Sequence, residues 1–371
     1  MRPLIKYLNN LFAKQRLLGD DTVLQGMAKA DALLLGLINT KKVPGLAITV
    51  LKEGKVLFQK GYGHADIDIK TPIDPKTTLF RTASVSKPIA ATALAYMVSE
   101  GTIDLDASFY IYVPYYPKKQ YDFTIRQLAG HTAGIRAYQG IEYGLNKPYT
   151  IKESVQIFKD DDLLFEPGTG YRYNSYDWVL VSLAMQEASG IPFEVYVQEK
   201  VLGPLGMVST IAPERYPSHT RTTPVVSGLT SKIASFYSKN KLGFRKAIPV
   251  NNFYKLAGGG YLSTSEDIAK FGNAYLEGTI LDQTTLAPFL TAEHINGDST
   301  YYGLGWQVST DSMGRPFYGH VGNGVGGYSN FFVYPEEQTV FAILINCTDP
   351  KVQETLDEVV EVILESQGRL G

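Results

Sequence analysis

Segments typical of β-strands lie at the two ends of this chain, and helix-like segments fill its middle. Residues 45–65 read as two strands around a tight turn at Glu53-Gly54, and residues 328–347 read as a strand, a turn and a second strand. Each strand needs partners to bury its apolar face. The simplest arrangement is an α/β fold of the α+β type, with one sheet built from both chain ends and covered by helices.

The middle of the chain has the periodicity of helices. Expected helices span residues 22–40, 84–100, 177–190, 265–278 and, near the end, 351–366. Gly101 and Gly190 are placed to end two of them, and Ser265 is expected to cap the start of another. Residues 226–252 are less patterned, so we expect a long surface connection there, of a kind that often borders a site.

The chain is predicted to form one folded unit over residues 1–371. Residues 22–80 and 300–371 are expected to build the sheet subdomain, and residues 81–299 a mainly helical subdomain with its connections.

Composition argues against several classes of function. Of 371 residues, 44% are hydrophobic and 19% are charged, which is typical of a folded globular chain. The net charge is −2 without a long basic run, so we expect no nucleic-acid partner. The single cysteine, Cys347, excludes an intrachain disulfide and a cysteine-based zinc site. His64, His219 and His294 lack partners at metal-ligand spacing, so we expect no metal.

The first residues combine positive charge with an apolar helical pattern. We expect residues 1–17 to form a helix that packs on its own protein, and a helix lying in a membrane interface is the alternative. The start lacks the continuous apolar core of a signal peptide, and no apolar stretch is long enough to span a membrane. The compartment stays open.

The segment RTASVSKPIA contains Ser84 and Lys87, a serine that could act as a nucleophile and a lysine that could accept its proton. If a helix starts near Ser84, these side chains lie on one face, about 5–6 Å apart at Cβ. A serine hydroxyl needs a proton acceptor, and a lysine can be one only if burial or nearby positive charge lowers its pKa. Ser86 would point away. On its own, this pattern also fits an ordinary helix start. The surrounding sequence must therefore decide whether Ser84 and Lys87 are catalytic.

The surroundings resemble the serine β-lactamase and DD-peptidase superfamily, specifically its class C-like branch. That branch contains class C β-lactamases, DD-peptidases, D-aminopeptidases, family VIII esterases and lactamase-like proteases. The resemblance runs from about Val43 to Cys347 and is carried by VPGLAITVLKEGKVLFQKGYGHAD, TLFRTASVSKPIAATAL, TIRQLAGHTAGI, LAGGGYLSTSEDIAKF and GHVGNGVGGYSNFFVYPE. It implies a β-lactamase/transpeptidase-like fold with a mainly antiparallel sheet and an inserted helical subdomain, and no cofactor.

The resemblance implies that Ser84 is the nucleophile and Lys87 its proton partner. The family's second element is normally Tyr-x-Asn. Here PGTGYRYNSYDW places Tyr173 on the tyrosine position, as general base or proton shuttle, and Ser175 where asparagine is common. Serine is shorter and makes fewer hydrogen bonds than asparagine. This departure weakens the expectation of efficient β-lactam or peptide cleavage.

The family's third element is normally Lys-Thr-Gly, and His320-Val321-Gly322 stands in its place. Gly322 would let a substrate backbone approach the strand. A neutral imidazole at His320 would anchor a carboxylate less strongly than an ammonium does; its alternative roles are to donate a hydrogen bond or to tune the tyrosine. The resemblance implies an oxyanion hole made of the backbone N–H groups of Ser84 and Asn323. His131 is expected to hold its own loop.

The implied activity is that of a serine hydrolase that cleaves an amide or ester through an acyl-enzyme on Ser84. The expected substrate is a small molecule or peptide with an acyl group, and peptidase-like or esterase-like substrates rank above β-lactams because of Ser175 and His320. The alternatives are a penicillin-binding or sensing module acylated without turnover, a β-lactamase and an acyltransferase. The sequence leaves the physiological substrate and the oligomeric state open.

Overall fold

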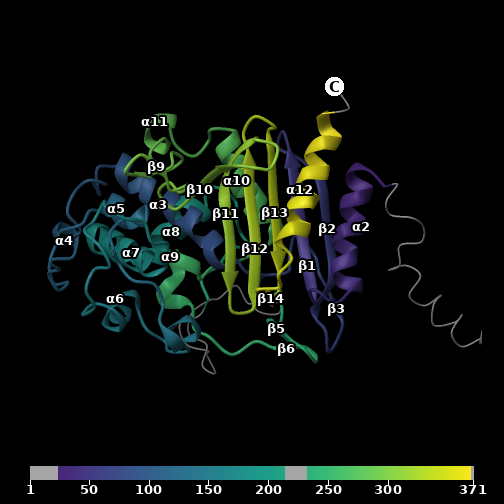
Figure 1. Ribbon diagram of the computed structural model, residues 1–371, viewed down its shortest axis with the longest axis horizontal. Coiled ribbons are helices and arrows are strands. Elements are labelled where there is room, and N and C mark those ends of the chain that lie inside the picture. Colours follow the sequence, from purple (N-terminus) through teal and green to yellow (C-terminus); the bar gives the residue numbers. More distant parts are fainter. Residues whose placement is uncertain (1–23, 214–231, 369–371) are drawn as a thin grey trace, which may run out of the picture.

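A computed structural model describes residues 24–213 and 232–368. Within them lies a seven-stranded antiparallel sheet (Figure 1), in the order β10 (Gln307–Thr310), β11 (Pro316–Gly324), β12 (Gly327–Tyr334), β13 (Thr339–Ile345), β1 (Gly45–Lys52), β2 (Lys55–Asp66) and β3 (Thr71–Pro72). Strand β1, from the start of the chain, pairs with β13, near its end. The sheet predicted from the two chain ends is therefore confirmed.

The hairpin of β1 and β2 turns at Glu53 and Gly54, as the sequence predicts. Both residues have positive φ angles, 49° and 73°, which suit a two-residue turn between twisted strands. Side chains of β1 alternate between two cores: Ile48 packs in one and Ala47 in the other. The sheet is thus covered on both faces.

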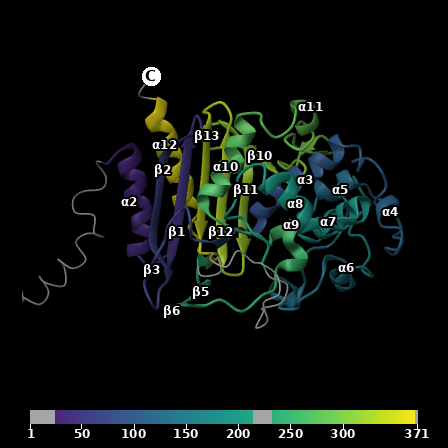
Figure 2. The same ribbon diagram turned by 180° about the vertical axis from the view of Figure 1, so that it is seen from behind.

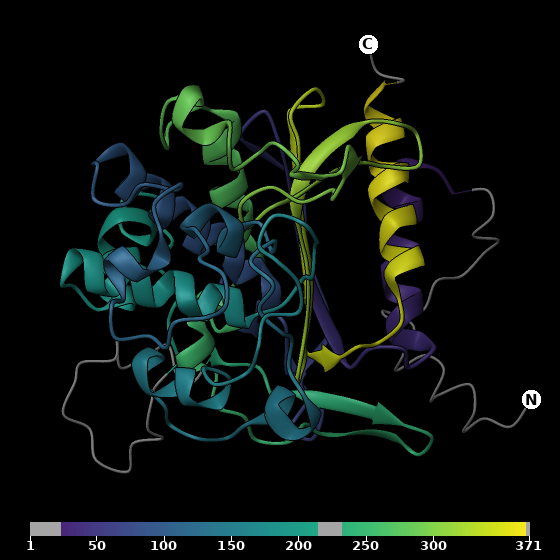
Figure 3. The same cartoon turned by 60° about the vertical axis from the view of Figure 1, so that its left-hand side comes forward.

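Helices cover the two faces unequally. The helices α2 (Gly26–Asn39) and α12 (Gln353–Gly368) pack side by side on one face, as Figure 3 shows. Helix α10 (Ser265–Leu276) packs on the other face, against β1, β12 and β13. The larger apolar core lies on that side, between the sheet and the helical region.

Two long helices form the centre of the helical region, α3 (Ser86–Ser99) and α7 (Tyr176–Ser189) (Figure 2). Both are buried over most of their length. Shorter helices surround them: α4 (Phe109–Tyr112), α5 (Ile125–Ala129), η4 (Gly140–Gly144), α6 (Ile151–Ser154), η5 (Val155–Ile157), α8 (Phe193–Val197), η6 (Gln198–Leu202), η8 (Phe253–Lys255), α9 (Leu256–Gly259) and α11 (Gln283–Leu286).

Two helix starts differ from the predictions. Helix α3 begins at Ser86 instead of near Ser84, because Ala83–Val85 form a separate 3₁₀ turn, η3, entered at a positive φ of 45° on Ala83. The cap of α10 is Thr264, whose side chain accepts a hydrogen bond from the Asp267 N–H, so the assignment of that cap to Ser265 was wrong. The Ser265 hydroxyl instead bonds to Thr49 on β1.

The expected surface connection over 226–252 contains regular structure in its described part. Strands β5 (Tyr237–Asn240) and β6 (Gly243–Lys246) form a hairpin, and β5 pairs with β14 (Cys347–Thr348). The buried ring of Tyr237 gives this hairpin an anchor that the sequence pattern does not reveal. Short pairs complete the described strands: β4 (Phe80–Arg81) with β7 (Leu262–Ser263), and β8 (His294–Ile295) with β9 (Asp298–Ser299).

The helix expected over residues 1–17 lies outside the described residues. Among the helices that are described, none has the length and apolar character needed to cross a membrane.

Candidate active site

Ser84 lies on η3, between strand β4 and helix α3. Ser86 points to the other side and is fully buried. Its hydroxyl oxygen lies 2.9 Å from the Thr82 hydroxyl and accepts a hydrogen bond of 3.1 Å from the Tyr261 N–H. Ser86 therefore holds the turn together, whereas Ser84 lines a pocket.

Three polar groups predicted from the sequence meet at Ser84. The Lys87 Nζ lies 3.2 Å from the Ser84 Oγ and 2.7 Å from the Tyr173 hydroxyl, and that hydroxyl lies 2.8 Å from the same Oγ. The Lys87 Nζ also donates to the Gly258 carbonyl on α9, at 2.7 Å. The three groups form a closed triangle of hydrogen-bond distances.

Burial changes the protonation of this triangle. The Lys87 side chain is fully buried, and burial is the main cause that lowers its pKa to about 7; the charge of Lys255 lowers it further, and Asp177 opposes the shift. A large fraction of Lys87 is thus neutral near pH 7. Burial raises the pKa of Tyr173 well above its ordinary value, so the phenol keeps its proton. Lys87 can hold a proton, and Tyr173 can relay one.

A buried polar cluster stands behind Tyr173. The His131 Nδ1 lies 2.7 Å from a carboxylate oxygen of Asp177, to which Asn174 also donates at 2.6 Å. The His131 ring meets the Tyr173 ring edge-on, with centroids 4.6 Å apart. Burial lowers the pKa of His131 and raises that of Asp177. This cluster can fix the Tyr173 loop, in line with the loop-holding role expected for His131.

Asp177 was not singled out by the sequence analysis. Its signal was an acid in the first turn of the otherwise apolar segment DWVLVSLAM. Ser175, just before α7, lines the pocket as expected of the residue in the asparagine position.

Strand β11 reaches the nucleophile through Gly322. A Cβ on this residue would lie 2.5 Å from the Thr82 carbonyl oxygen and 3.1 Å from the Ser84 nitrogen, so only glycine allows the strand to come so close. The Val321 N–H donates to Gln307, on the side of β11 away from β12. The N–H of Asn323, two residues on, points to the same side because strand N–H directions alternate. The geometry thus directs that N–H toward the edge of β11 that flanks Ser84.

His320 does not line the pocket. It is 1% exposed; its Nδ1 donates to the Val321 carbonyl at 2.6 Å, and its Nε2 accepts from the Tyr302 hydroxyl at 3.0 Å. Burial, with the charge of Lys87, lowers the pKa of His320 to about 3. A neutral imidazole with both nitrogens engaged is poorly placed to bind a carboxylate. Its ring centroid lies 5.8 Å from that of the Tyr173 ring. His320 is therefore placed to support the position of Tyr173.

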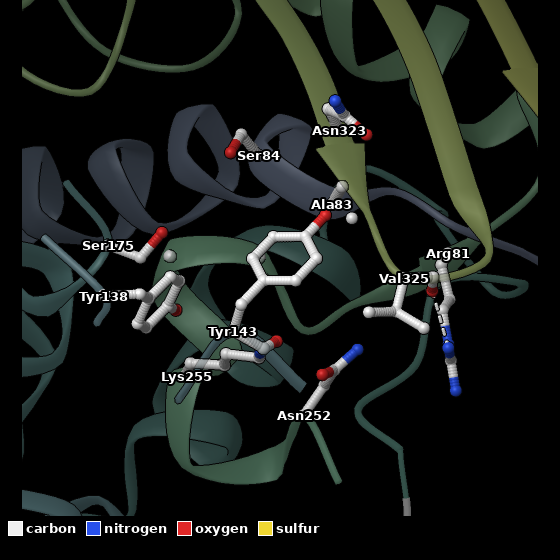
Figure 4. A pocket seen from close by; sticks show the side chains of 13 residues that line it. Arg81, Ala83, Ser84, Tyr138, Tyr143, Ser175, Asn252, Lys255, Asn323 and Val325 are labelled. Atoms are coloured by element: carbon white, nitrogen blue, oxygen red, sulfur yellow. Dashed lines mark hydrogen bonds between the residues drawn. The ribbon is translucent and has the colours of Figure 1, made fainter. Parts of the chain in front are cut away.

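The pocket itself has about 400 Å³ of space, part of it open to solvent (Figure 4). Several lining residues were missed from the sequence: Arg81, Tyr138, Tyr143, Asn252 and Lys255. Asn252 and Lys255 come from the end of the weakly patterned stretch and from the segment directly before LAGGG. Among the described residues no three His, Cys, Asp or Glu side chains are grouped so as to hold a metal, and the absence of a metal stays a prediction.

Comparisons with known proteins agree with the fold. A family model described as Beta-lactamase matches residues 20–364. The human serine beta-lactamase-like protein LACTB, mitochondrial, is 27% identical, with 79% of this chain and 69% of that protein aligned. Penicillin-binding protein 4* of Bacillus subtilis is 24% identical, over 85% of this chain and 71% of that protein.

Among solved structures, D-amino acid amidase from Ochrobactrum anthropi SV3, complexed with D-phenylalanine, superposes with a TM-score of 0.77. The match has 24% identity and covers 91% of this chain and 99% of that one. The predicted β-lactamase/transpeptidase-like fold is thus confirmed. With a family model over nearly its whole length, this chain belongs to the serine β-lactamase and DD-peptidase superfamily, a group of serine hydrolases.

Proposed function

We propose that this protein is a serine hydrolase that cleaves an amide or ester through an acyl-enzyme on Ser84. One observation carries the proposal: the Ser84 Oγ lies within hydrogen-bond distance of both the Tyr173 hydroxyl and the Lys87 Nζ, which also lie within that distance of each other. A serine with two such neighbours has what a nucleophile needs, a path for its proton and a group to receive it.

Acylation uses the neutral form of Lys87. The Ser84 hydroxyl donates to the Tyr173 oxygen, whose own proton is donated to the Lys87 amine. As the Ser84 Oγ attacks the substrate carbonyl carbon, both protons move along this path and Lys87 becomes an ammonium ion. The same path returns a proton to the leaving amine or alcohol when the C–N or C–O bond breaks.

The developing oxyanion is bound by the N–H groups of Ser84 and Asn323. Gly322 makes this pairing sterically feasible, because it lets β11 lie against the Ser84 nitrogen. Water then attacks the acyl-enzyme, and one of its protons passes along the path to Lys87. As the bond between the acyl carbon and the Ser84 Oγ breaks, Lys87 returns that proton to Oγ. This step regenerates the Ser84 hydroxyl and the neutral amine and releases the acyl group as a carboxylic acid.

Small amides, peptides and esters are the proposed substrates in preference to β-lactams. Ser175 offers a substrate amide fewer hydrogen bonds than an asparagine would, and His320 is buried and neutral. The solved relative whose name includes D-amino acid amidase supports amides as a substrate class.

The test is the turnover of 4-nitrophenyl acetate by the wild type and by Ser84→Ala, with Ser99→Ala as the matched control on the exposed end of α3. We expect turnover in the wild type and the control, and none above background in Ser84→Ala. Mass spectrometry of the quenched reaction should find the acetyl group on Ser84. A stable acetyl-enzyme without further turnover would identify an acylated binding module instead. Equal activity of Ser84→Ala and the wild type would refute the assignment of the nucleophile.

A further inference from the structure

Lys255 is a buried cation in the wall of the pocket that holds Ser84. It is 8% exposed and ends the short helix η8, directly before α9. Helix α9 fixes its position, because the Gly258 carbonyl binds Lys87 and a Cβ on Gly259 would lie 3.5 Å from the Ala83 backbone. Figure 4 shows Lys255 and Asn252 across the pocket from Ser84 and Asn323.

No acid of the described residues neutralises Lys255. Among the described residues its Nζ donates one hydrogen bond, a long one of 3.4 Å to the Tyr143 carbonyl, and it lies 5.2 Å from the centroid of the Tyr138 ring. No carboxylate in the described ranges lies within 4 Å of its Nζ, and the described residues that line the pocket include no aspartate or glutamate. A buried ammonium without a counter-ion is costly unless a ligand supplies the negative charge.

Arg81 adds a second positive charge to the same pocket. One of its guanidinium nitrogens donates to the Val325 carbonyl at 2.6 Å, and the guanidinium lies over the Phe236 ring. It too has no carboxylate partner in the described part of the chain. Burial, together with Arg81, lowers the pKa of Lys255 to about 8, which leaves the ammonium dominant at neutral pH.

We propose that Lys255 anchors a substrate carboxylate, with Arg81 adding positive potential, so that the preferred acyl substrates carry a carboxylate near the bond that is cleaved. The inference rests on the proposed function of Ser84 and names the substrate class of the same pocket. It places the anion-binding group on η8 instead of on β11, where His320 is buried and neutral. Asn252, whose buried side-chain oxygen has no partner in the described structure, lies beside Lys255 and can accept a substrate N–H.

The test compares pairs of chromogenic esters, one with and one without a carboxylate. For a carboxylate on the acyl side, 4-nitrophenyl hemisuccinate is paired with the isosteric 4-nitrophenyl 4-methylpentanoate. For a carboxylate on the leaving group, 3-carboxy-4-nitrophenyl acetate is paired with 4-nitrophenyl acetate. The readout is the ratio of kcat/KM within each pair, which cancels any change that a substitution causes at Lys87.

We expect the wild type to prefer the charged ester of at least one pair by about 10- to 100-fold, the usual range for a charge-assisted hydrogen bond. Lys255→Met should reduce that preference to about 1, Lys255→Arg should retain part of it, and the exposed Lys55→Met on β2 should leave it unchanged. The pair that responds shows on which side of the scissile bond the carboxylate lies. The same ratio in the wild type and Lys255→Met, for both pairs, would overturn the proposal.

A failure of the proposed hydrolase activity gives a different result, since no ester would then be turned over. In that case calorimetric titration with glutarate decides the subsite. Binding to the wild type and to Ser84→Ala that is lost in Lys255→Met would support the anion subsite without the hydrolase, and equal or absent binding in all three proteins would overturn it.

Discussion

The substitution Gly322→Ala tests whether the close approach of β11 to Ser84 builds the oxyanion hole. The new Cβ would lie 2.3 Å from the Ser329 hydroxyl oxygen, 2.5 Å from the Thr82 carbonyl oxygen and 3.1 Å from the Ser84 nitrogen. The serine side chain can rotate away, but the Thr82 carbonyl belongs to the backbone. Restoring an ordinary contact therefore requires β11 to move away from Thr82 by about 1 Å, a typical overpacking response.

A shift of this size moves the Asn323 N–H out of hydrogen-bond range of the developing oxyanion. The loss of one such donor lowers kcat by about 10²–10³-fold. The strain should also reduce the free energy of unfolding by about 1–3 kcal/mol. KM should change little, because the lost interaction strengthens mainly in the transition state.

The assay is the steady-state hydrolysis of 4-nitrophenyl acetate, together with thermal unfolding followed by circular dichroism. Gly36→Ala on α2 is the control, because no atom lies within 4 Å of the position that its new Cβ would take and its φ is not positive. It should keep wild-type kcat. If Gly322→Ala is folded at the assay temperature and its kcat stays within about threefold of wild type, the contribution of β11 to catalysis is refuted.

Four further outcomes follow from the site. Tyr173→Phe should lower kcat by about 10²–10⁴-fold, since it removes the proton relay; a near-normal rate would leave Lys87 as the direct acceptor. With a neutral ester, kcat/KM should rise with pH through about 7, because the competent Lys87 is neutral and its pKa is lowered to about 7; a fall over the same range would contradict this. Asp177→Ala should lower the free energy of unfolding by about 1–3 kcal/mol in urea titrations, because His131 loses its buried partner. Ser175→Asn should raise the hydrolysis of a chromogenic cephalosporin by about 3- to 10-fold, the effect of one added hydrogen bond, and no gain would show that Ser175 does not limit β-lactam cleavage.

Local signals account for the parts of the fold that could be predicted. The hairpin turn at Glu53-Gly54 and the apolar strand pairs at both chain ends specify β1, β2, β12 and β13. The cap of α10 was assigned to the wrong residue, since Thr264 and Ser265 are adjacent and both are good cap residues. The contact of Ser265 with Thr49, which is 216 positions away in sequence, decides between them.

The residues of the candidate site also fall into two groups, those that the sequence reveals and those that only the structure reveals. Ser84, Lys87 and Tyr173 stand in recognisable motifs, and the structure brings them together. Lys255 belongs to no recognisable motif. Because most lysines are exposed, its burial in the pocket wall could be found only from the structure. The role of His320 was equally hidden, because the hydrogen bonds that occupy its two nitrogens come from its neighbour on β11 and from the distant Tyr302.

Lys87 and Lys255 are coupled, and the coupling makes a prediction that neither residue makes alone. Burial is the main cause that lowers the pKa of Lys87, the charge of Lys255 lowers it further, and the charge of Asp177 raises it. The pKa of Lys255 is itself lowered by burial and by the charge of Arg81. A carboxylate substrate that pairs with Lys255 cancels part of the Lys255 charge, so the pKa of Lys87 is higher in the complex than in the free enzyme. Because kcat reports the complex and kcat/KM the free enzyme, the rising limb of kcat should lie at higher pH for a carboxylate ester than for its neutral partner.

The kcat/KM profile of the carboxylate ester should keep its rise near pH 7 and fall again near pH 8, as the Lys255 ammonium loses its proton. The neutral ester should lack that fall, and Lys255→Met should remove it from the profile of the carboxylate ester. If the two esters gave superimposable profiles of kcat/KM against pH, Lys255 would not bind the substrate carboxylate, even if Ser84 is the nucleophile. The buried lysine would then act only through its field on Lys87.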